Sequence, residues 1–279
     1  MEILGLTEGA FRLGIFASVF VTMAFAEAIL PRKTRVQPRA GRWVTNWALV
    51  IVDSIVLRIV FPILAVGVAV HANEQSWGLL ALVKLPFWIE AILAVVLLDL
   101  AVWAQHVASH KIPLLWRVHK VHHADRDIDV TTGVRFHPVE IMLSMAYKLV
   151  IVVLLGPAAI AVVLFEVILN ASAMFNHANV RLPLVIDRVL RAIIVTPDMH
   201  RVHHSIISRE TDSNYGFFLS IWDRMFGTYV AQPQHGHKGV VIGLDSYQDD
   251  SPSSLVWSIL VPFKSEKPAA KTRAGEQGL

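Results

Sequence analysis

Long apolar stretches constrain the fold of this chain more than any other sequence feature. A transmembrane helix needs about 20 mostly apolar residues to cross roughly 30 Å of hydrocarbon. Residues 11–30, 44–70 and 85–104 each meet this requirement. Residues 141–175 are too long for one span, and the Gly-Pro pair at 156–157 predicts a tight helical hairpin there. We therefore expect an all-α polytopic membrane protein with about four transmembrane helices plus a helical hairpin.

The composition agrees with a membrane setting and excludes several kinds of site. Hydrophobic residues make up 54% of the chain and charged residues only 17%. Cysteine is absent, which excludes disulfides, thiol nucleophiles and iron–sulfur clusters held by cysteine. The basic residues lie between apolar segments and do not alternate with aromatic residues, so nucleic acid is not an expected partner.

The distribution of charge predicts how the chain crosses the membrane. Residues 31–43 contain five Arg or Lys and no acidic residue, which by the positive-inside rule places them in the cytoplasm. The N-terminus is then outside, and the two polar stretches 106–140 and 176–250 both lie on the cytoplasmic side. We expect an integral protein of a bacterial inner membrane with a cytoplasmic active site and a cytoplasmic histidine-rich cap.

Histidines are concentrated in three clusters with helical spacing. The clusters are His106-x-x-x-His110, His119-x-x-His122-His123 and His200-x-x-His203-His204. Residues three and four apart share one face of a helix, so their imidazoles can converge on one metal ion or on two adjacent ions. Adjacent histidines diverge by about 100°, which suits contact with two different ions. The pattern predicts a metal site built from histidines.

The ligand type narrows the choice of metal. Imidazole binds several transition metals, whereas Mg²⁺ and Ca²⁺ prefer oxygen ligands. A structural zinc site needs only four ligands, and the clusters alone supply eight. We therefore favour redox-active iron, as two ions with open coordination positions.

Further motifs surround the clusters between Asp99 and Tyr229. They are Asp99 to His110, Trp116 to His123, Phe136-His137-Pro138, Asn176-His177, Thr196-Pro197-x-Met199-His200, Asn214-Tyr215-Gly216 and Trp222-Asp223-x-x-Phe226-Gly227-Thr228-Tyr229. With these motifs the chain resembles the fatty acid hydroxylase and sterol desaturase superfamily of integral-membrane di-iron oxygenases. The resemblance implies a cofactor of two non-haem Fe ions. It implies as metal ligands His106, His110, His119, His122, His123, His177, His200, His203 and His204.

One position departs from the pattern of this superfamily. Some members carry another ligand four residues after the position of His177, where this chain has Arg181. His137 either replaces that ligand or supports the site from outside the ligand set. His235 and His237 follow in a loop, where we expect them to be exposed to solvent.

Acidic and aromatic residues near the clusters are candidates for supporting roles. Metal-bound histidines usually donate their second ring N–H to a carboxylate or carbonyl, and Asp198 and Asp223 are candidates for this contact. Asp99 lies on the same helical stripe as His106 but deeper in the membrane. It supports the site, binds substrate, or is a charge neutralised by another intramembrane group such as Arg58. Trp103 is a candidate for the lining of a substrate tunnel.

The resemblance implies that the chain uses O2 to hydroxylate a C–H bond of a lipid, such as a fatty acyl chain or a sterol. No catalytic residue is expected beyond the metal ligands. Electrons would come from a separate donor, a ferredoxin or a cytochrome with its reductase, because no flavin, haem or nucleotide motif is present. The alternatives are a lipid desaturase of the same superfamily and a non-enzymatic transporter or sensor of divalent metals.

Three regions follow from this reading of the chain. Residues 1–84 are expected to form N-terminal transmembrane helices, and residues 85–250 a fatty acid hydroxylase-like di-iron domain. Residues 251–279 are expected to combine an interfacial segment at 255–263 with a disordered tail.

Overall fold

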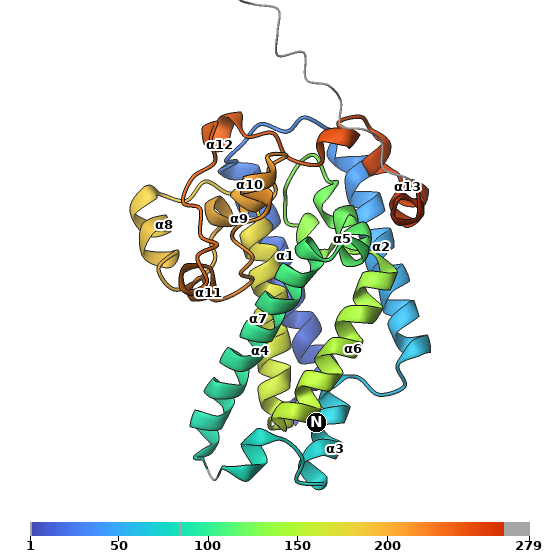
Figure 1. Ribbon diagram of the computed structural model, residues 1–279, viewed down its shortest axis with the longest axis vertical. Helices are drawn as coiled ribbons and strands as arrows, with labels where there is room; N and C mark the ends of the chain where they lie inside the picture. The colour runs from blue at the N-terminus through green and yellow to red at the C-terminus, as the bar shows by residue number, and fades with distance from the viewer. Residues whose placement is uncertain (1, 84, 265–279) are drawn as a thin grey trace, which may run out of the picture.

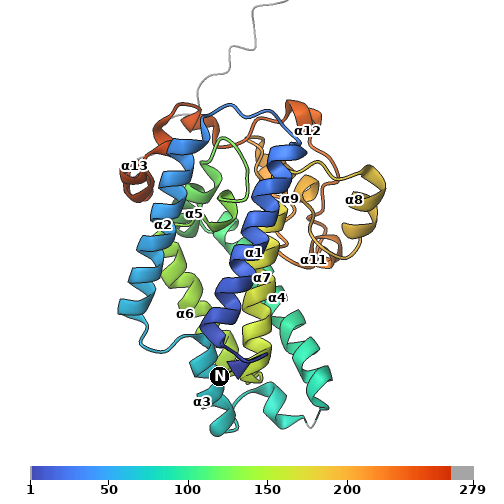
Figure 2. The same cartoon turned by 180° about the vertical axis from the view of Figure 1, so that it is seen from behind.

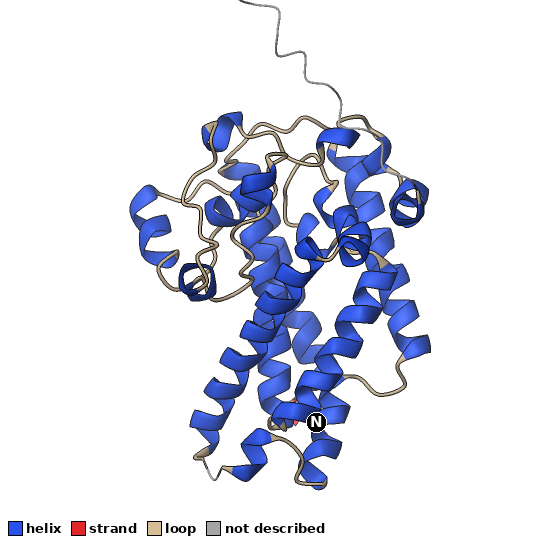
Figure 3. Ribbon diagram, in the orientation of Figure 1, coloured by secondary structure: helices blue, strands red, loops and turns tan. Residues whose placement is uncertain are grey.

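A computed structural model describes residues 2–83 and 85–264, whose regular secondary structure is almost entirely helical (Figures 1 and 3). The five longest helices are α1 (Glu8–Ile29), α2 (Arg39–Val60), α4 (Phe87–Lys111), α6 (Pro138–Leu155) and α7 (Ala159–His177). The shorter α-helices are α3 (Ala65–Glu74), α5 (Pro113–His123), α8 (Leu184–Leu190), α9 (Pro197–His203), α10 (Ser208–Thr211), α11 (Ile221–Met225), α12 (Gly236–Gly239) and α13 (Leu255–Leu260). The 3-10 helices are η1 (Leu79–Leu82), η2 (Thr132–Val134), η3 (Asp245–Tyr247), η4 (Ser251–Ser253) and η5 (Val261–Phe263). Strands β1 (Glu2–Ile3) and β2 (Leu6–Thr7) pair in an antiparallel hairpin.

Five segments of the described chain are long and apolar enough to cross a bilayer. They are α1, the region from Arg39 to Leu82, α4, α6 and α7. Large apolar side chains on the outer faces of α1 and α2, such as Leu13, Phe25 and Ile51, are more than half exposed. Such exposed apolar surface suits contact with lipid. The expectation of an all-α polytopic membrane protein is confirmed.

The second expected span, residues 44–70, has different bounds in the structure. Helix α2 ends at Val60, and Phe61 takes an extended conformation (φ −115°, ψ 98°). Pro62 is the physical reason, because a residue before proline is pushed out of the helical region. The chain then forms α3 as a separate helix, which packs against α6 and α7.

The hairpin between α6 and α7 forms where the sequence predicts it. Gly156 ends α6 in the left-handed conformation, with φ of 61°. A Cβ atom at Gly156 would lie 1.9 Å from the carbonyl oxygen of Trp77, so the α3–η1 loop approaches the hairpin too closely for any side chain. Glycine at this position therefore serves both the turn and the packing.

Most of the short helices gather at one end of the long-helix bundle (Figure 1). Helices α5, α9, α10 and α12 lie at the top of the molecule, while the N-terminus and α3 lie at the opposite end (Figures 1 and 2). Helix α13 packs with η5 at the same upper end, where Val261 belongs to one buried cluster with Leu49, Val121 and Tyr247. Of the disordered tail expected at 264–279, residues 265–279 lie outside the described residues. Both histidine-bearing polar stretches thus reach the same end of the molecule.

Candidate metal centre

Nine buried or nearly buried histidines converge from four helices at the upper end of the bundle. Helix α4 carries two of them, α5 three, and α7 one, while α9 and the residue after it carry the remaining three. Their side chains form two groups, within each of which the ligand nitrogens lie within 4.8 Å of one another. The first group is His106, His110, His119, His123 and His203. The second group is His122, His177, His200 and His204.

The two His-x-x-His-His motifs divide their histidines between these groups. In α5, His119 and His123 belong to the first group, whereas the adjacent His122 belongs to the second. In the motif of α9, His203 belongs to the first group and its neighbour His204 to the second. Adjacent residues on a helix point about 100° apart, so each motif contributes to two centres at once.

Local sequence signals set the ends of these helices. Helix α4 ends at Lys111, and α5 begins at Pro113, whose missing N–H suits the first turn of a helix. Helix α9 starts at Pro197, and the hydroxyl of its cap Thr196 accepts a hydrogen bond from the backbone N–H of Met199. Both short ligand-bearing helices therefore start at a proline.

The Nε2 atoms in each group are spaced as ligands of one ion would be. Nε2 of His106 lies 3.1 Å from Nε2 of both His119 and His203. Nε2 of His177 lies 3.0 Å from Nε2 of both His122 and His200. Two nitrogens bound at about 2.1 Å and at right angles are separated by about 3.0 Å, compared with about 3.4 Å in a tetrahedral site. The spacing fits five- or six-coordinate centres.

Backbone carbonyls determine which ring nitrogen faces each centre. Nδ1 of His106 lies 2.6 Å from the carbonyl oxygen of Tyr215. Nδ1 of His177 lies 2.6 Å from the carbonyl oxygen of Ala173. The Nδ1 atoms of His122 and His203 likewise lie 3.1 Å and 2.7 Å from backbone carbonyls. A carbonyl only accepts, so Nδ1 carries the proton, and the Nε2 lone pair is left for a metal.

The carboxylate of Glu140 accepts the Nδ1–H of His119, as the backbone carbonyls do for these four histidines. The sequence analysis did not single out this residue. Its Oε1 lies 2.5 Å from Nδ1 of His119, and both side chains are buried. Glu140 occupies the first turn of α6, and its only signal in the sequence is an acidic residue at the start of an apolar helix. Asp198 and Asp223, the two aspartates expected in this role, do not bond to a ring nitrogen of the two histidine groups in the described chain.

Several ring nitrogens in the two groups are buried without any hydrogen-bond partner among the described residues. They include Nε2 of His110, Nδ1 of His200 and both ring nitrogens of His123 and His204. Buried polar atoms are normally paired, and an unpaired one costs free energy. A metal ion would provide the missing partner for Nε2 of His110 and for one ring nitrogen each of His123 and His204.

Burial also keeps the rings in the form that binds metal. Burial, together with the neighbouring histidines, lowers the pKa of His122, His123, His200 and His204 well below its usual value. Burial likewise lowers the pKa of His203 to about 3. These rings are therefore neutral at pH 7, and neutral imidazole is the form that ligates. Spacing, unpaired nitrogens and protonation all fit two divalent cations.

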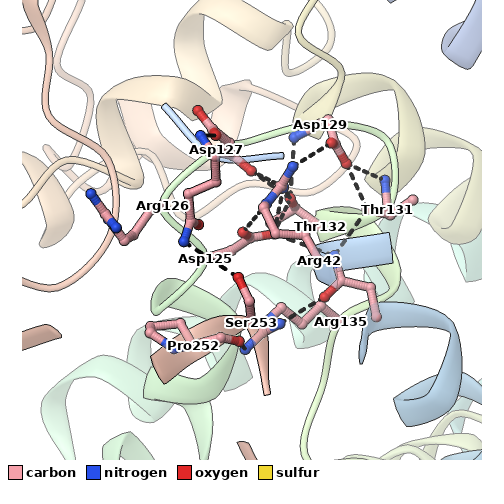
Figure 4. A network of polar contacts seen from close by, with 12 residues as sticks. Arg42, Asp125, Arg126, Asp127, Asp129, Thr131, Thr132, Arg135, Pro252 and Ser253 are labelled. Atoms are coloured by element: carbon pink, nitrogen blue, oxygen red, sulfur yellow. Dashed lines mark hydrogen bonds and ion pairs between the residues drawn. The ribbon is translucent and has the colours of Figure 1, made fainter. Parts of the chain in front are cut away.

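A buried ionic network holds the loop that follows α5 (Figure 4). Arg42 of α2 contacts Asp125 at 2.5 Å and Asp129 at 2.7 Å, and its guanidinium also donates to the carbonyl of Asp127. Burial raises the pKa of Asp125, but the charge and hydrogen bonds of Arg42 outweigh it and lower that pKa to about 2. The adjacent Arg135 donates to the carbonyl of Val121 at 2.9 Å.

This network positions His122 through the backbone of Arg135. The carbonyl of Arg135 lies 3.1 Å from Nδ1 of His122, while its side chain donates to Asn46 of α2 at 2.7 Å. In the same loop, a Cβ atom at Gly133 would lie 2.5 Å from the carbonyl of Ala173, which itself faces His177. Helix α2 and the 125–135 loop thus position ligands that lie far away in the sequence.

His137 lies outside both groups. Its Nδ1 accepts a hydrogen bond from the backbone N–H of Val139, and its Nε2 lies 3.1 Å from the carbonyl of Ile259. Both ring nitrogens are therefore committed, the first as acceptor and the second as donor. His137 acts as the cap of α6 and tethers the segment around α13.

Asp198 lies near the centre without contacting its histidines. The carboxylate is paired with Arg32 at 2.8 Å and with Arg201 at 2.5 Å. His237 lies 3.4 Å from the same carboxylate and is buried, so its expected exposure was wrong. The reason is tertiary, because the 233–240 segment folds back onto α9.

Asp223 supports the site through the backbone. Its carboxylate accepts hydrogen bonds from the N–H of Tyr215 at 2.8 Å and from the N–H of Gly216 at 2.9 Å. The carbonyl of Tyr215 is the one that faces His106. Trp103 donates to Asp223 at 3.1 Å and stacks on Phe226.

Asp99 is one helical layer further from the histidines. It accepts hydrogen bonds from the indole of Trp222 at 2.8 Å and from the N–H of Leu219 at 3.1 Å. It forms no ion pair with Arg58 in the described parts of the chain, so pairing with Arg58 was the wrong alternative.

Comparison with known proteins places this geometry in a family. Residues 91–228, which carry all nine histidines, match the model of the fatty acid hydroxylase family. This part of the chain is a fatty acid hydroxylase domain. The resemblance seen in the sequence motifs is thereby confirmed.

The relatives of the fatty acid hydroxylase domain act on lipids, according to their names. The chain is 25% identical over 229 residues to ornithine lipid hydroxylase OlsE of Rhizobium tropici, covering 79% of this chain and 67% of that protein. It is 28% identical over 192 residues to the alkylglycerol monooxygenase of Xenopus tropicalis, and the match covers 65% of this chain and 40% of that protein. The human alkylglycerol monooxygenase is 28% identical to it over 162 residues, and the match covers 56% of this chain and 33% of the human protein. The chain thus spans less than half the length of these vertebrate relatives. No solved structure matches the chain.

A cavity of about 550 Å³ leads from the histidines of the fatty acid hydroxylase domain into the helix bundle. At one end it is lined by His106, His119 and Glu140, and side chains of α1, α2, α4, α6 and α7 form its walls. Trp103 is not among the lining residues. The cavity is large enough for part of a lipid, and it ends at the first histidine group.

Proposed function

We propose that this protein is a membrane-bound di-iron oxygenase that hydroxylates a C–H bond of a lipid. The observation that carries the proposal is the cavity within the membrane-spanning bundle that ends at the first of the two adjoining groups of buried histidines. The match to the fatty acid hydroxylase family and the lipid hydroxylases and monooxygenases among the relatives support the same reaction.

The nine histidines would hold two iron ions, one in each group. Iron bound there supplies the redox chemistry by which O2 is activated. The protein's own contribution is placement. Glu140 and the carbonyls of Tyr215, Ala173, Arg135 and Ser213 orient the rings, while the buried walls exclude bulk water from the site.

The reaction must balance in electrons and protons. Hydroxylation inserts one oxygen atom of O2 into the C–H bond and reduces the other to water, which consumes two electrons and two protons. We propose that the electrons come from a separate donor, a ferredoxin or a cytochrome with its reductase. Purified protein that turns over repeatedly with NADH alone would contradict this part of the proposal.

We place the protein in the inner membrane of a bacterium, with the N-terminus outside and the histidine end in the cytoplasm. The basic segment between α1 and α2 supports this orientation, because it lies at the same end as the histidines (Figure 1). A relative from Rhizobium tropici supports the bacterial setting.

Desaturation and metal transport are less well supported. The named relatives are hydroxylases and monooxygenases, which favours insertion of oxygen over formation of a double bond. A transport path would need ligands at several depths of the membrane. The nine histidines instead form two adjoining groups at one end of the bundle.

Lipid analysis of a host with and without the protein tests the proposal. We expect a lipid species heavier by one oxygen atom in the expressing cells, and iron in the purified protein. The His123→Ala variant should lose the product, whereas His137→Ala serves as the matched control, because His137 lies outside both groups. Zinc uptake into vesicles without any oxidised lipid would refute the oxygenase and support a transporter.

A further inference from the structure

The cavity wall is mostly apolar but also carries several polar and charged side chains. Beyond the histidine end it is lined by the polar residues Ser54, Gln105, Ser109, Ser144 and Asn170. The charged residues of the lining are Glu8, Arg12, Asp53, Arg58, Glu140, Lys148 and Glu166. Charged side chains within membrane-spanning segments are costly and are generally retained for a function. A charged residue of the lining that is not paired within the protein therefore indicates what kind of ligand the cavity binds.

Four of these charges neutralise one another at the far end of the cavity. Glu166 of α7 is bound by Arg12 at 2.7 Å and by Lys148 at 2.7 Å, and Arg12 also contacts Glu8 at 3.1 Å. Two cations and two carboxylates are balanced in this network. It ties α1, α6 and α7 together and offers no net charge to a ligand.

Asp53 of α2 differs from these residues because no ion pair with a cation is found for it in the described part of the chain. Its side chain is buried, with 7% of the residue exposed, and it lines the cavity. Its Oδ1 has no hydrogen-bond partner among residues 2–83 and 85–264. A buried carboxylate without a cation or a donor is strongly unfavourable. An ionised Asp53 therefore needs a cation that the described chain does not supply.

Nearby cations do not fill this role. Arg58 lies five positions further along α2, is exposed, and forms no ion pair with Asp53 in the described chain. Arg12 and Lys148 are bound to Glu166. The other carboxylate on the histidine side of the cavity, Glu140, adds to the negative charge.

We propose that Asp53 binds a cationic amine on the lipid, so that the substrate class is a lipid whose polar part carries a free amino group. The inference rests on the proposed function and specifies its substrate. An ammonium group can form short, charge-assisted hydrogen bonds with the Asp53 carboxylate. The polar wall then accommodates the rest of the polar part of the lipid, while the carbon to be oxidised lies toward His106 and His119.

Lipid binding, measured apart from turnover, tests this assignment. The full-length protein in detergent is incubated with an ornithine lipid, which has a free amine, and with the same lipid after N-acetylation. Native mass spectrometry then reports how much of each lipid is retained. We expect wild-type protein to retain the free amine at least about tenfold better, because acetylation removes the charge that Asp53 binds.

Two variants make the test specific. Asp53→Asn keeps the size of the side chain and should abolish the preference for the free amine. Ser54→Ala is the matched control, because the Ser54 hydroxyl lines the same cavity but donates to the carbonyl of Val50 at 2.7 Å. Ser54→Ala should keep the wild-type preference.

Equal retention of the two lipids by wild-type protein would overturn the assignment, and this result needs no variant to fold. An unchanged preference in folded Asp53→Asn would overturn it as well. The binding result is independent of catalysis. A clear amine preference without any oxidised lipid would refute only the proposed reaction, whereas oxidation of acetylated and free lipid alike would refute only the role of Asp53.

Discussion

The contact between Glu140 and His119 leads to the sharpest prediction for the metal centre. A carboxylate that accepts the Nδ1–H of a ligand histidine fixes the ring and raises its basicity. The distance of 2.5 Å and the burial of both side chains indicate a strong, charge-assisted hydrogen bond. Changing Glu140 should therefore weaken metal binding without removing a ligand.

The magnitude follows from the kind of hydrogen bond that is lost. Glu140→Gln keeps an oxygen acceptor but removes its charge, which replaces a bond worth about 1.5–3 kcal/mol by one worth about 0.5–1.5 kcal/mol. The difference of about 1 to 1.5 kcal/mol corresponds to a loss of roughly tenfold in metal affinity. Glu140→Ala removes the acceptor altogether and should approach a hundredfold loss.

Iron titration with a competing chelator measures these affinities, and Glu166→Gln is the matched control. Glu166 is also a buried carboxylate of the same cavity, but it binds Arg12 and Lys148 and not a histidine. Its variant should bind iron like the wild type. Glu140→Ala with wild-type affinity, or equal losses in Glu140→Gln and Glu166→Gln, would refute the reasoning.

Three further predictions concern stability, each measured by thermal unfolding of the protein in detergent. Arg42→Met leaves two buried carboxylates without their cation and should lower the free energy of unfolding by about 3–5 kcal/mol. Arg58→Met, at an exposed position of the same helix, is the control and should lower it by under about 1 kcal/mol. Equal losses in the two variants would contradict the role of the buried network. Burial lowers the pKa of His237 to about 4, although Asp198 acts in the opposite direction. The unfolded ring takes up its proton below about pH 6.5 and the folded ring only below about 4, so stability should fall as the pH drops through this window, by about 2 kcal/mol near pH 5. His237→Asn should remove that part of the pH dependence, and an unchanged profile would show that His237 does not cause it. Gly156→Ala should cost about 1–3 kcal/mol, because its Cβ would strike the carbonyl of Trp77 at a residue with positive φ, and a wild-type melting temperature would contradict that close approach.

Much of the architecture could be read from the sequence, because it depends on local patterns. Apolar runs of sufficient length predict the membrane-spanning helices, and the Gly-Pro pair predicts the hairpin. The exception was the end of the second span. There Pro62 stops α2 inside a run that remains apolar, so hydropathy alone could not locate the boundary.

The histidine site was visible in the sequence for the same reason. Spacings of three and four residues mark one face of a helix, and the nine expected histidines all meet in the structure. Their division into two groups depends on how α4, α5, α7 and α9 are packed together. No spacing along the chain contains that information.

The sequence by itself therefore determined the membrane-spanning helices, the set of clustered histidines and the family. Only the tertiary structure decided that Glu140 supports His119, that both ring nitrogens of His137 bond to backbone groups, and that Asp53 lines the cavity with no partner for its Oδ1 among the described residues. The physical reason is that hydrogen-bond partnership and burial depend on contacts between residues distant in the chain. Side-chain type and helical period, in contrast, are local properties of the sequence.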